Sequence, residues 1–99
     1  MRLVWTARAR ARLRQIHGYI AREDHPLNAE RVVERITRRV EPLLEHPRLG
    51  RVVERYQRED IRELIESPYR IIYLIADDRI DILTVRDTRR LLPRRLDEL

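Results

Sequence analysis

The chain has 99 residues, of which 42% are hydrophobic and 39% are charged, and its formal net charge is +5. This length predicts one domain with a single modest core, and the composition is too apolar for a disordered chain. No apolar run approaches about 18 residues, so we expect no transmembrane helix, and the charged N-terminal region predicts no signal peptide. The absence of cysteine excludes disulfides, thiol catalysis and cysteine-based zinc sites. A cytoplasmic protein is the plain interpretation.

The basic charge consists entirely of arginine, which makes up all 22 basic residues. Because arginine does not readily release its proton, mechanisms that need a lysine base or a Schiff-base lysine are excluded. The single domain expected over residues 1–99 has two basic ends, residues 1–22 and a tail at residues 88–99, around a slightly acidic middle. These ends suit an anionic partner, either nucleic acid or acidic protein, or else a solvated helix face and a frayed tail.

The N-terminal third predicts a short strand and a helix. A β-rich run at residues 3–5 is followed by Thr6, a residue type that commonly caps helices. An apolar stripe with helical spacing then predicts a helix over residues 7–22, which Pro26 ends. The stripe consists of Ala9, Leu13, Ile16 and Ile20.

A second helix is expected to begin with Asn28 as its cap. Its apolar stripe runs from Ala29 to Leu44 and passes Pro42, which lacks a backbone donor, so we expect a kink or a break near Val40. The continuing stripe favours a kink. Two amphipathic helices with a short connection predict an antiparallel helical hairpin.

The second half of the chain predicts an antiparallel sheet. Residues 69–76 are apolar on both faces and predict a central strand, whereas residues 61–65 alternate with charges and predict an edge strand. A return strand is expected over residues 79–87, and a short strand begins at residues 52–53. Helices early and strands late indicate the α+β class, with the helical hairpin packed on one face of a mainly antiparallel sheet.

Sites for metals, cofactors and nucleophilic catalysis are not expected. The three histidines, His17, His25 and His46, lack the spacing of metal ligands, and two glycines are too few for a phosphate-binding loop. The one serine, Ser67, precedes a proline in a predicted turn, which makes a serine triad improbable.

Four arginines are candidates for binding the target or a phosphate group. Arg70 interrupts the apolar central strand, so its guanidinium needs either a carboxylate from a neighbouring strand or a groove. Arg89 and Arg90 follow the last strand directly, and Arg62 lies on the preceding charged strand. Together they could form a patch that binds phosphate or an acidic protein. Aromatic residues for stacking nucleic-acid bases are scarce.

The order of short motifs resembles the RelE/ParE toxins of type II toxin–antitoxin modules over about nine-tenths of the chain. The resemblance rests on Val4-Trp5-Thr6, Ala9–Leu13, Ile16–Ala21, Pro26, Ala29, Ile36, Pro47–Arg51, Arg62–Leu64, Tyr69–Tyr73 and Ile80–Val85. It implies a compact β-α-α-β-β-β fold and a cognate antitoxin as partner.

Two branches of this family differ in their targets. RelE-like members cleave messenger RNA on the ribosome, whereas ParE-like members, which include plasmid stabilisation proteins, inhibit DNA gyrase. Arg70 matches a phosphate-contacting arginine of the ribonuclease branch, and Arg90 matches a second. However, Ile61 to Glu63 stand where that branch carries a lysine base, and Leu96 stands near its C-terminal tyrosine. The resemblance therefore favours a gyrase inhibitor without catalytic residues. The alternatives are a ribosome-dependent mRNA endoribonuclease and a non-toxic member that only binds its antitoxin.

The resemblance also implies a disordered antitoxin tail that folds on binding and makes a hetero-oligomer with the toxin. Such tails dock amphipathic helices with acidic residues facing basic rims. The first predicted helix offers such a rim, formed by Arg8, Arg10, Arg12 and Arg14. We expect the tail to cover the outer face of the helical hairpin and to run on toward residues 88–99.

Overall fold

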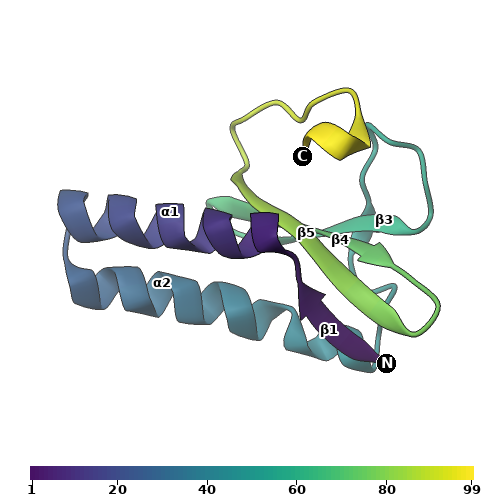
Figure 1. Ribbon diagram of the computed structural model, residues 1–99, viewed down its shortest axis with the longest axis horizontal. Helices are drawn as coiled ribbons and strands as arrows, with labels where there is room; N and C mark the ends of the chain where they lie inside the picture. Colours follow the sequence, from purple (N-terminus) through teal and green to yellow (C-terminus); the bar gives the residue numbers. More distant parts are fainter.

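The computed structural model describes residues 1–99 as two α-helices packed on a five-stranded sheet, which confirms the predicted α+β class (Figure 1). Neither α-helix has the length and hydrophobicity of a membrane-spanning segment. The elements in chain order are β1 (Arg2–Trp5), α1 (Ala7–Glu23), α2 (Pro26–Arg39), the 3₁₀ helix η1 (Glu41–Leu44), β2 (Arg51–Val52), β3 (Ile61–Glu66), β4 (Tyr69–Ile75), β5 (Arg79–Asp87) and the 3₁₀ helix η2 (Leu96–Glu98).

The strands lie in the order β1-β5-β4-β3-β2, with β1 parallel to β5 and the other pairs antiparallel. The prediction of a central strand at β4 is confirmed. The prediction of an edge strand at residues 61–65 is wrong, because β2 pairs with β3 on its outer side. The first four residues of β3, Ile61 to Leu64, are buried, and these include the charged residues Arg62 and Glu63. Charged residues on this strand are therefore compatible with burial because they have partners.

The two helices begin at side-chain caps. The Thr6 hydroxyl accepts a hydrogen bond from the amide of Ala9 at 3.1 Å, as its position predicts, and donates one to the carbonyl of Ile82 on β5 at 2.9 Å. The prediction that Asn28 caps the second helix is wrong. That helix begins at Pro26, whose missing N–H costs nothing in a first turn, and His25 Nδ1 accepts from the amide of Leu27 at 3.1 Å.

The apolar stripe of the second helix continues past a break, whereas of the two alternatives near Val40 the sequence favours a kink. Helix α2 ends at Arg39, and a separate 3₁₀ helix carries Pro42 in its first turn. The proline cannot donate to a carbonyl one turn back, so the ladder of α-helical hydrogen bonds stops at this point. Leu43 of η1 is still fully buried in the same core as Ile36 of α2.

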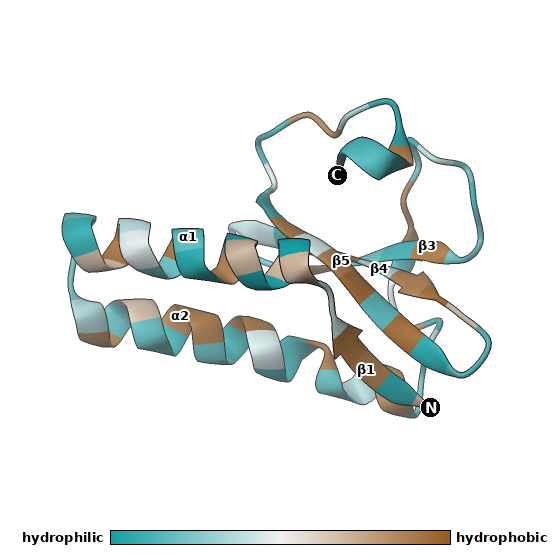
Figure 2. Ribbon diagram, viewed as in Figure 1, coloured by the Kyte–Doolittle hydropathy of each residue, from teal (hydrophilic) through white to brown (hydrophobic).

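Both faces of the sheet are covered. The helices and η1 cover one face, where Ile36, Val40 and Leu43 contact buried residues of β4 and β5. The second face is covered by the C-terminal segment, whose Leu92 and Leu99 join a smaller core with Ile72. This segment (yellow in Figure 1) and α2 lie on opposite sides of β5, along which hydrophobic and hydrophilic residues alternate (Figure 2). The tail at residues 88–99 is therefore packed against the sheet, not frayed.

Candidate anion-binding site

An arginine-rich cavity of about 410 Å³ opens on the second face of the sheet, where the chain leaves β5. Five arginines and two glutamates line it, so its lining carries an excess of positive charge and favours an anionic ligand. The charged and polar residues of the lining are Arg51, Glu54, Arg55, Glu63, Arg70, Thr88, Arg89 and Arg90.

The centre of the cavity is an ion pair between neighbouring strands. Glu63 on β3 pairs with Ile72, and Ile65 pairs with Arg70 on β4, so Glu63 and Arg70 are diagonal neighbours on one face. Arg70 Nη1 lies 3.5 Å from Glu63 Oε1, and the two side chains are 19% and 5% exposed. Arg70 thus has both of the surroundings that the sequence allows for it, a carboxylate on a neighbouring strand and a cavity. Arg51 Nε approaches the other carboxylate oxygen of Glu63, also at 3.5 Å.

The polar groups of this ion pair keep unused hydrogen-bonding capacity. Arg70 Nη2 donates to the carbonyl of Thr88 at 3.2 Å, but Arg70 Nε and Glu63 Oε1 are buried without a hydrogen-bond partner. Buried polar groups are usually hydrogen-bonded, so unpaired ones need a physical reason. A site that completes its hydrogen bonds only when a ligand is bound provides that reason.

Arg89 and Arg90 join Arg70 at this cavity, as the sequence predicts. Arg89 is 83% exposed and forms a two-bond contact with Asp87, at 2.7 and 3.0 Å. These side-chain hydrogen bonds, with a further one from the Arg89 amide, hold the pKa of Asp87 well below its usual range. Arg90 is exposed and forms no ion pair, so its guanidinium is available to a ligand.

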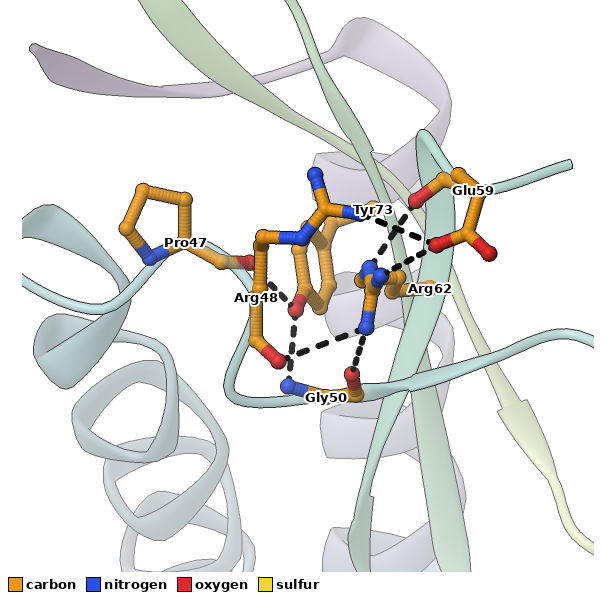
Figure 3. A network of polar contacts seen from close by, with 6 residues as sticks. All are labelled: Pro47, Arg48, Gly50, Glu59, Arg62 and Tyr73. Carbon is orange, nitrogen blue, oxygen red and sulfur yellow. Dashed lines mark hydrogen bonds and ion pairs between the residues drawn. The ribbon is translucent and has the colours of Figure 1, made fainter.

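Arg62 lies apart from the other three candidate arginines, on the helix-facing side of β3 (Figure 3). It is 8% exposed, and its guanidinium donates to the carbonyls of Glu59 and Gly50, both at 2.9 Å, and to the Glu59 carboxylate at 2.8 Å. The bonds to Glu59 tie β3 to the loop between β2 and β3, and the bond to Gly50 ties it to the loop before β2. The Arg62 guanidinium therefore holds this loop in place.

The same loop is held by Tyr73 of β4 (Figure 3). Its hydroxyl accepts from the amide of Gly50 at 2.9 Å and donates to the carbonyl of Pro47 at 2.7 Å. A Cβ at Gly50 would lie 2.5 Å from the carbonyl oxygen of Glu63, so only glycine fits there. Because Arg51 follows Gly50 directly, this network sets the position from which Arg51 reaches Glu63.

Sequence reasoning did not assign five of the charged and polar lining residues to the site: Arg51, Glu54, Arg55, Glu63 and Thr88. Arg51 and Arg55 come from the segment around the two-residue strand β2, which is too short to give a periodic signal. Glu63 could have been found, because a carboxylate on the strand next to Arg70 is the partner that a buried arginine requires.

The four arginines expected to form a rim for the antitoxin do not share one surface. Arg8 donates to the carbonyl oxygen of Leu99 and holds the end of the C-terminal segment, whereas Arg10 donates to the carbonyl of Trp5 at 2.9 Å. Arg12 is half-buried and donates to Gln15 Oε1 at 3.4 Å, and Arg14 is exposed.

Known proteins resemble this chain over most of its length. Residues 3–92 match the family described as ParE toxin of the type II toxin–antitoxin system parDE. The chain is 36% identical to the toxin RelE2 of Caulobacter vibrioides over 90% of this chain and 97% of that protein. It is 40% identical to the putative toxin Y4kP of Sinorhizobium fredii over 93% of each chain. The solved structure described as the chromosomal ParDE TA system from P. aeruginosa superposes with a TM-score of 0.75 and 26% identity, over 88% of this chain and 95% of that chain.

Proposed function

Because this chain belongs to the family of ParE toxins of type II toxin–antitoxin systems, we propose that it arrests growth by binding DNA gyrase and is neutralised by a cognate antitoxin. Its role as the toxin component follows from the family. Gyrase as the target, and direct binding of the antitoxin as the means of neutralisation, are the proposal.

The observation that carries the proposal is that the buried carboxylate of the arginine-rich cavity, Glu63, is paired with two arginines. Cleavage of RNA through its 2′-hydroxyl needs a group that accepts a proton, and such help is worth about 10²–10⁴-fold in rate. Arginine as a residue type is a poor proton acceptor. Glu63 is 5% exposed and lies 3.5 Å from each of two guanidinium groups. This arrangement suits holding an anionic surface of a protein target better than moving a proton.

A ribosome-dependent mRNA endoribonuclease is the second candidate. It is favoured by the position of Arg70 and Arg90, which line one cavity and could contact the same phosphate group. In that function Glu63, the carboxylate 3.5 Å from Arg70, would accept the proton. Replacing Glu63 by Gln would then abolish cleavage.

The two functions predict different results for the purified protein. The unaltered chain is expected to inhibit DNA supercoiling by gyrase, and the double variant Arg89→Ala/Arg90→Ala is expected to keep its fold and to inhibit at least about tenfold less. A matched control is Arg14→Ala/Arg22→Ala, because both of these arginines are exposed on α1. If supercoiling is unaffected, and translating ribosomes instead show codon-linked mRNA cuts that Glu63→Gln abolishes, the gyrase proposal is wrong.

A further inference from the structure

A second cavity, of about 660 Å³, lies between α1 and the adjoining ends of β4 and β5. Arg12 and Tyr19 line it from α1, Tyr69 from β4, and Arg86 from β5. It meets the arginine-rich cavity only at Arg89 and Arg90, which line both.

Arg86 is the unusual residue of this second cavity. It is half-buried, forms no ion pair, and makes one hydrogen bond, from Nη2 to the carbonyl of Leu91 at 3.3 Å. Its Nε is buried without a partner. Arg70 lies directly opposite on β4, so the register pairs two arginines side by side. Like charges opposite one another on a sheet destabilise it.

The surroundings of Arg86 contain more positive charge and no compensating carboxylate. Burial lowers the pKa of Arg86, and the charges of Arg12 from α1 and Arg90 from the segment after β5 lower it further. The nearest carboxylate on its own strand, Asp87, is occupied by Arg89. The free protein therefore carries an uncompensated cluster of cations, which an anion in the cavity would relieve.

The remaining walls decide which kind of anion fits. Ile16, Val85 and the rings of Tyr19 and Tyr69 make part of the lining apolar, and Tyr19 is 59% exposed. The aliphatic walls, Ile16 and Val85, suit aliphatic side chains of a protein segment, which a line of phosphates does not carry. A protein segment that alternates acidic and apolar side chains fits this lining better than a nucleic-acid strand does.

We propose that this second cavity receives an acidic, amphipathic segment of the antitoxin, with one carboxylate bound by Arg86 and Arg12 and an adjacent apolar side chain against Tyr19 and Tyr69. The inference rests on the proposed direct binding of an antitoxin. It places the segment at the end of the sheet beside α1, not along the outer face of the helical hairpin. The arginine-rich cavity, which shares Arg89 and Arg90 with this second cavity, remains the surface proposed for the target.

Poly-L-glutamate is a suitable probe, because it offers carboxylates without phosphate. Binding to the full chain is measured at low salt by calorimetry, for the unaltered protein, for Arg86→Gln and for Arg14→Gln. Arg14 is the matched control, since it is an exposed arginine of the same basic region without ion pairs. We expect Arg86→Gln to weaken binding about tenfold or more and Arg14→Gln to change it less than about twofold.

Thermal unfolding separates a binding role from a structural one. Free Arg86→Gln is expected to melt at or above the midpoint of the unaltered protein, because the substitution removes like-charge crowding, and poly-L-glutamate should no longer raise that midpoint. The proposal is overturned if Arg86→Gln melts well below the unaltered protein, or if both variants lose affinity for poly-L-glutamate equally. It is also overturned if Arg86→Gln impairs binding of polyuridylate but not of poly-L-glutamate, which would indicate a nucleic-acid site. Gyrase inhibition by the unaltered chain tests the proposed target independently of these outcomes.

Discussion

Arg70→Ala is the substitution that tests most directly how the arginine-rich cavity is held together. The guanidinium of Arg70 is the less exposed of the two cations beside Glu63, and both lie 3.5 Å from its carboxylate. After truncation, the nearly buried Glu63 would retain only Arg51, whose side chain is 71% exposed. Water screens such an exposed cation, so most of the compensation for the buried carboxylate is lost.

The expected cost follows from the burial of this pair. Removing one partner of a buried ion pair destabilises a protein by about 3–5 kcal/mol. We expect about 3 kcal/mol here, the lower end, because Arg70 is itself 19% exposed and because its removal relieves repulsion with Arg86 across the strand pair. For a domain of this size, that loss corresponds to a fall in Tm of about 12–24 °C.

Urea unfolding at neutral pH and thermal unfolding followed by circular dichroism measure this cost. Arg38→Ala is the control, because Arg38 is 72% exposed and its pair with Glu34 contributes at most about 0.5 kcal/mol. The double variant Arg70→Met/Glu63→Leu should recover most of the loss, since apolar residues can replace a buried ion pair. A loss below about 1 kcal/mol for Arg70→Ala would show that Glu63 is solvated, and the argument from burial would then be wrong.

Other predictions concern the loop before β2 and the C-terminal segment. Gly50→Ala should destabilise by about 2 kcal/mol or more in urea unfolding, because its Cβ would lie 2.5 Å from the Glu63 carbonyl, whereas Gly18→Ala on α1 should be neutral or stabilising. Burial raises the pKa of Tyr73, so the folded protein holds this proton more tightly than the unfolded chain. The stability that the protonated Tyr73 contributes is fully present below pH about 10, and it is lost as the pH rises through the raised pKa of the folded protein. Tyr73→Phe should therefore flatten the alkaline fall in the free energy of unfolding. An unchanged pH dependence would show that Tyr73 is not its source. Arg8→Ala should speed carboxypeptidase digestion of residues 91–99, because Arg8 binds the carbonyl of Leu99, and an unchanged digestion rate would show that the contact does not hold the segment.

The sequence predicts those parts of the fold where one local pattern has one physical explanation. Residues 69–75 are apolar on both faces, and a strand that buries both faces must lie inside a sheet. Thr6 stands directly before an apolar helical stripe, and its hydroxyl caps that helix as expected. Arg70 interrupts an otherwise apolar strand, so the need for either a carboxylate partner or a groove follows from the sequence alone.

Other features depend on contacts between distant residues, which local patterns do not contain. The charges of Arg62 and Glu63 look like the solvent side of an edge strand, but Glu59, Arg51 and Arg70 compensate them. Alternation of charge cannot distinguish a solvated side chain from a paired one. The choice between a kink and a break near Val40 also depends on distant contacts, because these determine the path of the chain after Pro42.

The C-terminal segment shows how such long-range information could be recovered by argument. A central strand with two apolar faces requires a cover on each face, and the helical hairpin can supply only one. The apolar residues left for the second face are those of residues 53–56 and 91–99, and these contribute Val53, Tyr56, Leu92 and Leu99 to its core. Because Leu92 and Leu99 anchor this segment, the chain that leaves β5 must turn back over the sheet, and this turn places Arg89 and Arg90 between the two cavities. The positions of the exposed arginines are thus determined by the burial of the leucines that follow them.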